Sequence, residues 1–197
     1  MSAIAEVLES TSTSFLAELY SDEFEIEFGS VVKIFDEQRE FPVWGVVTNI
    51  FNQGTYERQP VAFGMSRTEL TKTHPQLTQL LKTRFEAIII GYGDVLDFSP
   101  NIPTKPPLIH DQAQLLDDID FNVLGNNLSF LRFLFLSESN LTDELVFKLI
   151  SKIYEIEDRN LQILVKAGKE ISLNLQNDYE RIRKIISRFE TLIQNGE

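Results

Sequence analysis

The periodicity of the hydrophobic residues changes along this chain, and that change constrains the fold more than any other feature of the sequence. In the first part, apolar and polar residues alternate, most clearly in Phe24-Glu25-Ile26-Glu27-Phe28, as expected for a β-strand with one buried face. In the last part, apolar residues recur every three or four positions, as expected for amphipathic helices. The chain therefore predicts an α+β fold in which the strands come first and the helices last.

The strand-like segments are short and follow one another at fairly regular spacing, which favours a small β-barrel or a β-sandwich. Besides residues 24–28, we expect strands at residues 3–8, 14–20, 31–35, 43–51 and 85–90. Gly45 lies inside the longest of these segments. A glycine within a strand often marks a bulge or a sharp bend, so we expect an irregularity there.

A helical segment is expected to interrupt these strands at about residues 66–83. Ser66 and Glu69 form the S-x-x-E pattern of a capping box, in which the two residues satisfy backbone N–H groups at the start of a helix. Pro75 cannot lie in the interior of a helix without breaking it. We therefore expect a short helical turn after Ser66 and a second helix from Pro75 to Thr83.

A proline-rich segment separates the two patterns. Four of the seven prolines of the chain lie between residues 100 and 107, and such a segment is extended and semi-rigid. We therefore expect a β-domain at residues 1–108 and a helical region at residues 109–197. Within the helical region, residues 122–136 leave two alternatives open, because their leucines suit a helix whereas their phenylalanine-rich end suits a buried strand.

Two helices are expected further along the chain. The first is predicted to be capped by Thr142, with Asp143 and Glu144 complementing the helix dipole in the first turn. The second has the most regular spacing, because six apolar residues follow one another at intervals of 4, 3, 4, 3 and 4 positions. These residues are Leu175, Tyr179, Ile182, Ile186, Phe189 and Ile193. A long apolar face must be covered by the chain itself or by a partner, so all six are candidate partner-binding residues.

The net charge of −12 is unevenly distributed along the chain. Residues 1–64 contain 11 acidic and 3 basic side chains, whereas residues 121–197 contain 11 and 10. Because an acidic surface repels phosphate groups, this distribution disfavours nucleic-acid binding through the β-domain. An alternative remains at the basic face of the last helix, where the candidate nucleic-acid contacts are Arg181, Arg183, Lys184 and Arg188.

The residue types needed for catalysis or metal binding are scarce. The chain has no cysteine and only two histidines, His74 and His110, which excludes disulfides and thiolate metal sites. His110 precedes Asp111, but no serine-centred nucleophile motif accompanies this pair. Residues 118–122 open like a calcium-binding loop, yet Val123 stands where such a loop requires glycine. We therefore expect no catalytic residue, no metal ion and no cofactor.

The sequence also lacks the features of a secreted or membrane protein. The first ten residues contain no basic segment followed by an apolar run. The most apolar stretch, residues 130–136, contains Arg132 and is far shorter than a membrane-spanning helix. We therefore expect a soluble cytoplasmic protein that does not contact a membrane.

Two glycine–valine steps in the β-domain point to a known family. The first is Gly29-Ser30-Val31-Val32-Lys33-Ile34, and the second is Trp44-Gly45-Val46-Val47-Thr48-Asn49-Ile50. Together with residues 5–12 and 15–19, these motifs resemble the HAS-barrel family, named for the barrel shared by HerA-type hexameric translocases and ATP synthase. The resemblance covers about residues 1–110 and implies that the β-domain is a barrel.

The resemblance also implies a function, because in this family the barrel serves assembly and docking at the end of a ring. The chain departs from the family by lacking the phosphate-binding loop G-x-x-x-x-G-K-[ST]. Its single Gly-Lys pair, Gly168-Lys169, is followed by Glu170, so no cradle for a phosphate is expected. We therefore expect a non-enzymatic docking or assembly module, an adaptor for another protein such as an oligomeric ATPase, or for further copies of itself.

Overall fold

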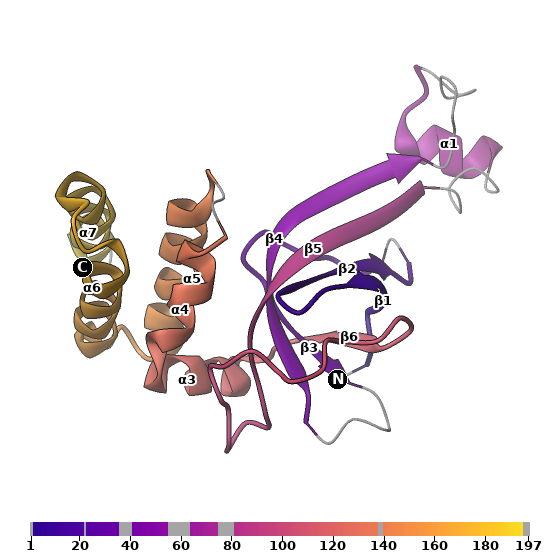
Figure 1. Ribbon diagram of the computed structural model, residues 1–197. Helices are drawn as coiled ribbons and strands as arrows, with labels where there is room; N and C mark the ends of the chain where they lie inside the picture. Colours follow the sequence, from indigo (N-terminus) through magenta and orange to yellow (C-terminus); the bar gives the residue numbers. More distant parts are fainter. Residues whose placement is uncertain are drawn as a thin grey trace.

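The computed structural model describes residues 2–21, 23–35, 41–54, 64–74, 81–137 and 140–194. Within these residues, six antiparallel strands close into a barrel in the order β1-β2-β5-β4-β3-β6, and helices follow, which confirms the α+β prediction (Figure 1). The strands are β1 (Ala5–Ser10), β2 (Ser14–Leu19), β3 (Val31–Phe35), β4 (Val43–Gly54), β5 (Leu81–Tyr92) and β6 (Gln112–Leu115).

Alternate side chains of these strands fill the barrel interior. They form one apolar cluster that includes Val7, Phe15, Val32, Phe85 and Ile89. Residue 45, which lies beside this cluster, has room only for glycine, because a Cβ atom at this position would lie 2.5 Å from Cε1 of the Phe15 ring. The register of β4 against β5 also shifts between Trp44 and Gly45, which confirms the irregularity expected at this glycine.

Part of the outer face of β3, β4 and β5 is buried as well, because the helices cover it. Val31, Trp44, Val46 and Ile90 belong to the same apolar cluster as the helical residues. This double burial explains why apolar residues stand next to one another at Val31-Val32, Val46-Val47 and Ile89-Ile90 and do not alternate with polar ones there. The indole Nε1 of Trp44 donates a hydrogen bond to the carbonyl oxygen of Gly93 at 2.7 Å, so its polar atom is satisfied within the core.

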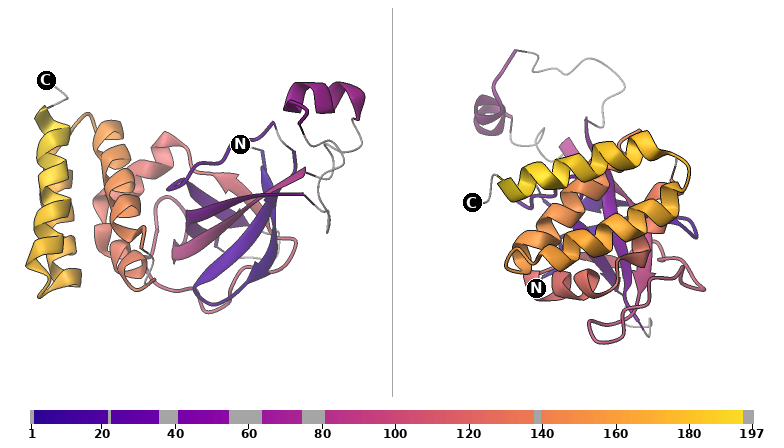
Figure 2. Two further views of the ribbon diagram at one scale, coloured as in Figure 1. Left: turned by 90° about the horizontal axis from the view of Figure 1, so that it is seen from above. Right: turned by 90° about the vertical axis from the view of Figure 1, so that its left-hand side faces the viewer.

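The helices form two layers on one side of the barrel, and α6 and α7 make up the outer layer (Figure 2). The C-terminal region contains α3 (Asp118–Asn126), the 3-10 helix η1 (Leu128–Phe130), α4 (Leu131–Phe135), α5 (Thr142–Ile156), α6 (Leu161–Leu175) and α7 (Tyr179–Gln194). Residues 122–136 therefore belong to three short helices apart from Asn127 and Leu136, and the alternative of a buried strand is wrong. Thr142 is the first residue of α5, whereas its N-cap is Leu141.

The strands β4 and β5 continue beyond the barrel as a two-stranded ribbon, in which Asn52 pairs with Thr83. The ribbon leads away from the helical layers toward α1 (Arg67–Thr73). The predicted capping box is confirmed, because the Glu69 backbone N–H donates to Oγ of Ser66 and the Ser66 N–H donates to the Glu69 carboxylate.

The helix expected at residues 75–83 is only partly open to comparison. Residues 75–80 lie outside the described residues, whereas residues 81–83 belong to β5. The expected helix is thus wrong at its end. Cross-strand pairing with β4 reaches as far as Leu81, and this pairing outweighs the local helical spacing.

Residues 24–28 alternate in exposure as the sequence predicted, but they do not form a strand. Phe24 and Ile26 pack against the barrel cluster, whereas Phe28 packs against the helical one. The physical reason is that β6 pairs with the free side of β3 and also with β1, so the closed barrel offers no edge to another strand.

The barrel also continues beyond residue 108, where the sequence placed its end. Strand β6 lies at Gln112–Leu115, after the proline-rich segment. Its backbone closes the barrel although only Ala113 is buried among its four residues. The helices therefore begin at Asp118, after Asp117, whose side chain caps α3 by accepting from the N–H of Asp120 at 2.8 Å.

Candidate docking site

The apolar face predicted at residues 175–193 does not belong to one helix. Leu175 ends α6, and α7 begins at Tyr179 after a turn in which Gln176 has a φ of 31°. The intervening helix α6 was not predicted, because exposed apolar residues such as Leu161 and Leu173 obscure its spacing. The expected single helix over these positions is therefore wrong.

Most of the α7 face is covered by the chain itself. Phe189 is buried, and its ring stacks on that of Phe147 of α5 with the centroids 5.7 Å apart. Ile182 and Ile193 pack partly against the same core, and Ile186 is half-buried. Tyr179 is different, because it is 75% exposed. The α7 face thus contributes mainly to the core of the helical region.

Two of the four basic residues of α7 bind carboxylates of α5, and the other two do not. Arg181 Nε donates to Asp143 Oδ1 at 2.8 Å, and this hydrogen bond raises the pKa of Arg181. Arg188 binds the Glu144 carboxylate through two nitrogens at 2.7 and 2.8 Å. Both partners lie on α5, so these arginines join α7 to α5.

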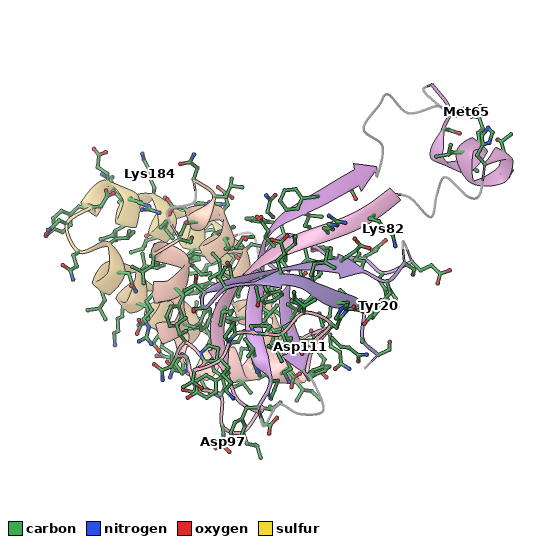
Figure 3. All side chains as sticks on the ribbon, turned by 45° about the vertical axis from the view of Figure 1, so that its right-hand side comes forward. Tyr20, Met65, Lys82, Asp97, Asp111 and Lys184 are labelled. Carbon is green, nitrogen blue, oxygen red and sulfur yellow. The ribbon has the colours of Figure 1, made fainter. Side chains whose placement is uncertain are left out.

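The other two basic residues, Arg183 and Lys184, are exposed. Lys184 projects from the outer helical layer (Figure 3). A phosphate backbone would therefore meet two available cations on this face, because the carboxylates of α5 already bind the other two.

His110 and Asp111 lie in the turn before β6, and both side chains make contacts within the fold. His110 has a φ of 75°, and its exposed ring contacts the Glu6 carboxylate through Nδ1. Asp111 is buried and accepts a hydrogen bond from the backbone N–H of Leu108 at 2.7 Å. The two side chains therefore serve different partners.

The acidic residues at 118–122 are also used within the fold. Asp118 and Asp120 lie in the first turn of α3, and Asp120 forms an ion pair with Lys33. Across the described ranges, no three histidine or acidic side chains gather in a way that could hold a metal ion. Across the same ranges, no helix combines the length and the apolar character needed to cross a membrane.

The structure contains a cleft of about 810 Å³ between the barrel and a helical side that consists of Phe133, Leu136, Ser137 and Leu141. We name it the barrel–helix cleft. Its apolar lining includes the buried Phe15, Ala87 and Ile89 and the more exposed Leu16, Ile88, Ile102, Phe133, Leu136 and Leu141. Leu136 is 74% exposed and Leu141 is 52% exposed, so the helical wall of the cleft presents aliphatic surface to solvent.

The barrel wall of the cleft also carries polar and acidic side chains. Serine and threonine residues of the β1–β2 turn line it together with Thr48, Asn49, Glu9 and Glu86. The register shifts beside Glu9 in β1 and beside Asn49 in β4, and such bulges redirect side chains. The cleft therefore combines an aliphatic wall with two carboxylates.

The sequence did not predict the barrel–helix cleft. Its residues come from strands β1, β2, β4 and β5, from the β1–β2 turn, from residue 102, from α4 and from residues 136, 137 and 141, which no local pattern brings together. The nearest signal was two leucines, Leu136 and Leu141, in a short connection rich in polar residues.

Comparison with known proteins leaves the site to be interpreted from its own geometry. Neither the protein-family models nor the curated proteins include a match to this chain.

Proposed function

We propose that this chain is a non-enzymatic docking module that binds another protein. The observation that carries this proposal is the exposed aliphatic surface of the barrel–helix cleft, where Leu136 is 74% exposed beside the half-buried Phe133 and Ile88. A cleft of this kind marks a binding surface, because apolar side chains that meet in one concave place gain free energy when a partner removes them from water.

The electrostatics and the resemblance refine the proposal. The motifs at residues 29–34 and 44–50 resemble the HAS-barrel family, and the described strands form a closed barrel that is compatible with it. We therefore propose that the partner is an oligomeric ATPase and that the chain acts in the cytoplasm. The lack of a phosphate-binding loop in the sequence supports an adaptor role over an ATPase activity of the chain itself.

The proposal is tested by cross-linking the full-length chain in its own cells and identifying the captured partner. We expect one protein to be captured reproducibly and to lose most of its yield with Leu136→Ser. The matched variant Leu96→Ser, which changes a leucine that is 94% exposed away from the cleft, should retain the yield. Capture that is equal in both variants would contradict docking at the cleft.

Self-association is the second outcome that the same preparation can decide. Light scattering on the purified chain gives its mass in solution. We expect a monomer of 22.7 kDa in the absence of the partner. A stable dimer that dissociates with Leu136→Ser would assign the cleft to contacts between copies of this chain.

A further inference from the structure

We propose that the occupant of the barrel–helix cleft is a short amphipathic segment of a partner protein that carries both aliphatic and basic side chains. This inference rests on the proposed docking function and adds the chemistry of the segment that is recognised. Three features of the cleft support it: its aliphatic wall, its two carboxylates and strands whose backbone groups are already paired with neighbouring strands.

The aliphatic wall requires a ligand that brings apolar surface of its own. Leu136 and Leu141 line the helical side of the cleft, and Leu16 and Ile88 lie half-buried on the barrel side. A small polar ligand would leave this surface in water, whereas aliphatic side chains would remove it at roughly 25 cal/mol for each Å² buried. The occupant therefore has leucine-like or isoleucine-like residues on one side.

The two carboxylates require positive charge on the same segment. Glu9 and Glu86 are exposed, line the cleft, and form no ion pair with any lysine or arginine in the part of the chain that the structure describes. Glu18, on β2 beside the cleft residue Leu16, is instead bound by Lys82 at 3.4 Å and by Arg84 at 2.8 Å. The chain neutralises the neighbouring carboxylate and leaves the two in the cleft for a ligand.

The charge of the chain argues against a second copy as the occupant. The chain carries a net charge of −12, and most of the acidic excess lies in residues 1–64, which supply much of the cleft. A second copy that docked through its own barrel would bring further acidic surface toward Glu9 and Glu86. A basic segment would instead be steered toward them and would associate faster at low salt.

The strands at the floor of the cleft are already paired with their neighbours on both sides. Ser14 pairs with Ile88 and Leu16 with Glu86 between β2 and β5, and Glu86 also pairs with Asn49 of β4. An additional strand therefore has no ladder to join at the centre of the cleft. Recognition must come from side chains, which is how an amphipathic segment binds in a groove.

The test uses three synthetic 14-residue peptides with the full-length protein. The first carries leucine and lysine at helical spacing, the second replaces every lysine by glutamate, and the third has the composition of the first in scrambled order. Fluorescence anisotropy gives the affinity. Methyl NMR of the labelled protein then locates the binding, and we expect shifts of Leu16, Ile88, Leu136 and Leu141 with the first peptide.

Matched variants separate the cleft from general attraction to an acidic protein. We expect Glu9→Gln with Glu86→Gln to weaken the leucine–lysine peptide about tenfold, since two exposed ion pairs are lost. The control Glu23→Gln with Glu25→Gln removes the same charge from two exposed acids outside the cleft and should change the affinity less than twofold. Equal effects of the two double variants, or equal binding of the glutamate peptide, would overturn the proposal.

The same variants distinguish this proposal from the proposed function. If capture of the cellular partner is lost with Leu136→Ser but not with Glu9→Gln and Glu86→Gln, docking at the cleft stands and the basic segment is wrong. If neither variant changes the capture, the docking function at this cleft fails together with the inference. Loss of capture with both variants supports both.

Discussion

Lys33 of β3 reaches Asp120 of α3, with its Nζ 2.5 Å from Asp120 Oδ2, and so joins the barrel to the helical region. The two side chains are only 12% and 16% exposed. The Lys33 ammonium group also lies 4.6 Å from the centre of the Trp44 ring. The contact thus combines an ion pair with a cation–π interaction at the junction of the two parts.

We expect Lys33→Met to lower the free energy of unfolding by about 2 kcal/mol, because it leaves the Asp120 carboxylate partly buried without its partner. Urea denaturation measures this change. The double variant Lys33→Met with Asp120→Asn should lose less than the sum of the single variants. Strict additivity would show that the ion pair contributes nothing to stability.

The close approach of Phe15 to Gly45 makes a second prediction. We expect Gly45→Ala to destabilise the protein by about 1–3 kcal/mol, since the added methyl group would lie 2.5 Å from the Phe15 ring. Phe15→Leu in the same chain should recover part of this loss. Gly168→Ala is the control, because among the described residues a Cβ there would meet nothing within 4 Å apart from its chain neighbours and the backbone of its own helix, and it should stabilise helix α6 by about 0.5–1 kcal/mol.

The third prediction concerns nucleic-acid binding by α7. Since Arg181 and Arg188 are paired with α5, only Arg183 and Lys184 of this basic face are available, and the logarithm of the affinity for duplex DNA should fall with the logarithm of salt with a slope of about −1.8 or shallower. Filter binding between low and high salt measures it. A slope of about −3.6 that depends on Arg181 would instead establish α7 as a nucleic-acid site.

The capping box of α1 predicts a local dependence on pH. The hydrogen bonds from the backbone and the side chain of Ser66 lower the pKa of Glu69, so the carboxylate supports α1 at neutral pH. This support should be lost as the pH falls through the lowered pKa. NMR titration of Glu69 together with the amide signals of α1 measures the effect, and Glu69→Gln should remove the pH dependence. A midpoint at or above the ordinary glutamate value would contradict the hydrogen bonds.

The sequence predicted best those elements whose residues are constrained locally. Strand β4 was predicted because its sequence is a long run of β-branched and aromatic residues, which favour a strand. The capping pair Ser66 and Glu69 predicted the start of α1. Strand β6 was missed because it has four residues and one buried side chain. Its position is determined by closure of the barrel, which is a property of the whole sheet.

The candidate site was less predictable for the same reason. The apolar residues on α7 were identified correctly as a face that must be covered, but the spacing from Leu175 to Tyr179 concealed a turn. What covers that face is α5 together with α6, as the packing of Phe147 against Phe189 shows for α5. The barrel–helix cleft joins residues from both parts of the chain, so no window of sequence contains its pattern.

The pairing of Ala5 with Ala113 sets the order in which this protein can mature on the ribosome. The barrel cannot close until β6 at Gln112–Leu115 has left the exit tunnel, so more than half of the chain is synthesised while β1 and β3 still lack their last neighbour. Exposed strand edges invite pairing with other chains. A nascent chain that ends before residue 112 leaves the edges of β1 and β3 open to pairing with other chains, and synthesis of β6 covers both edges.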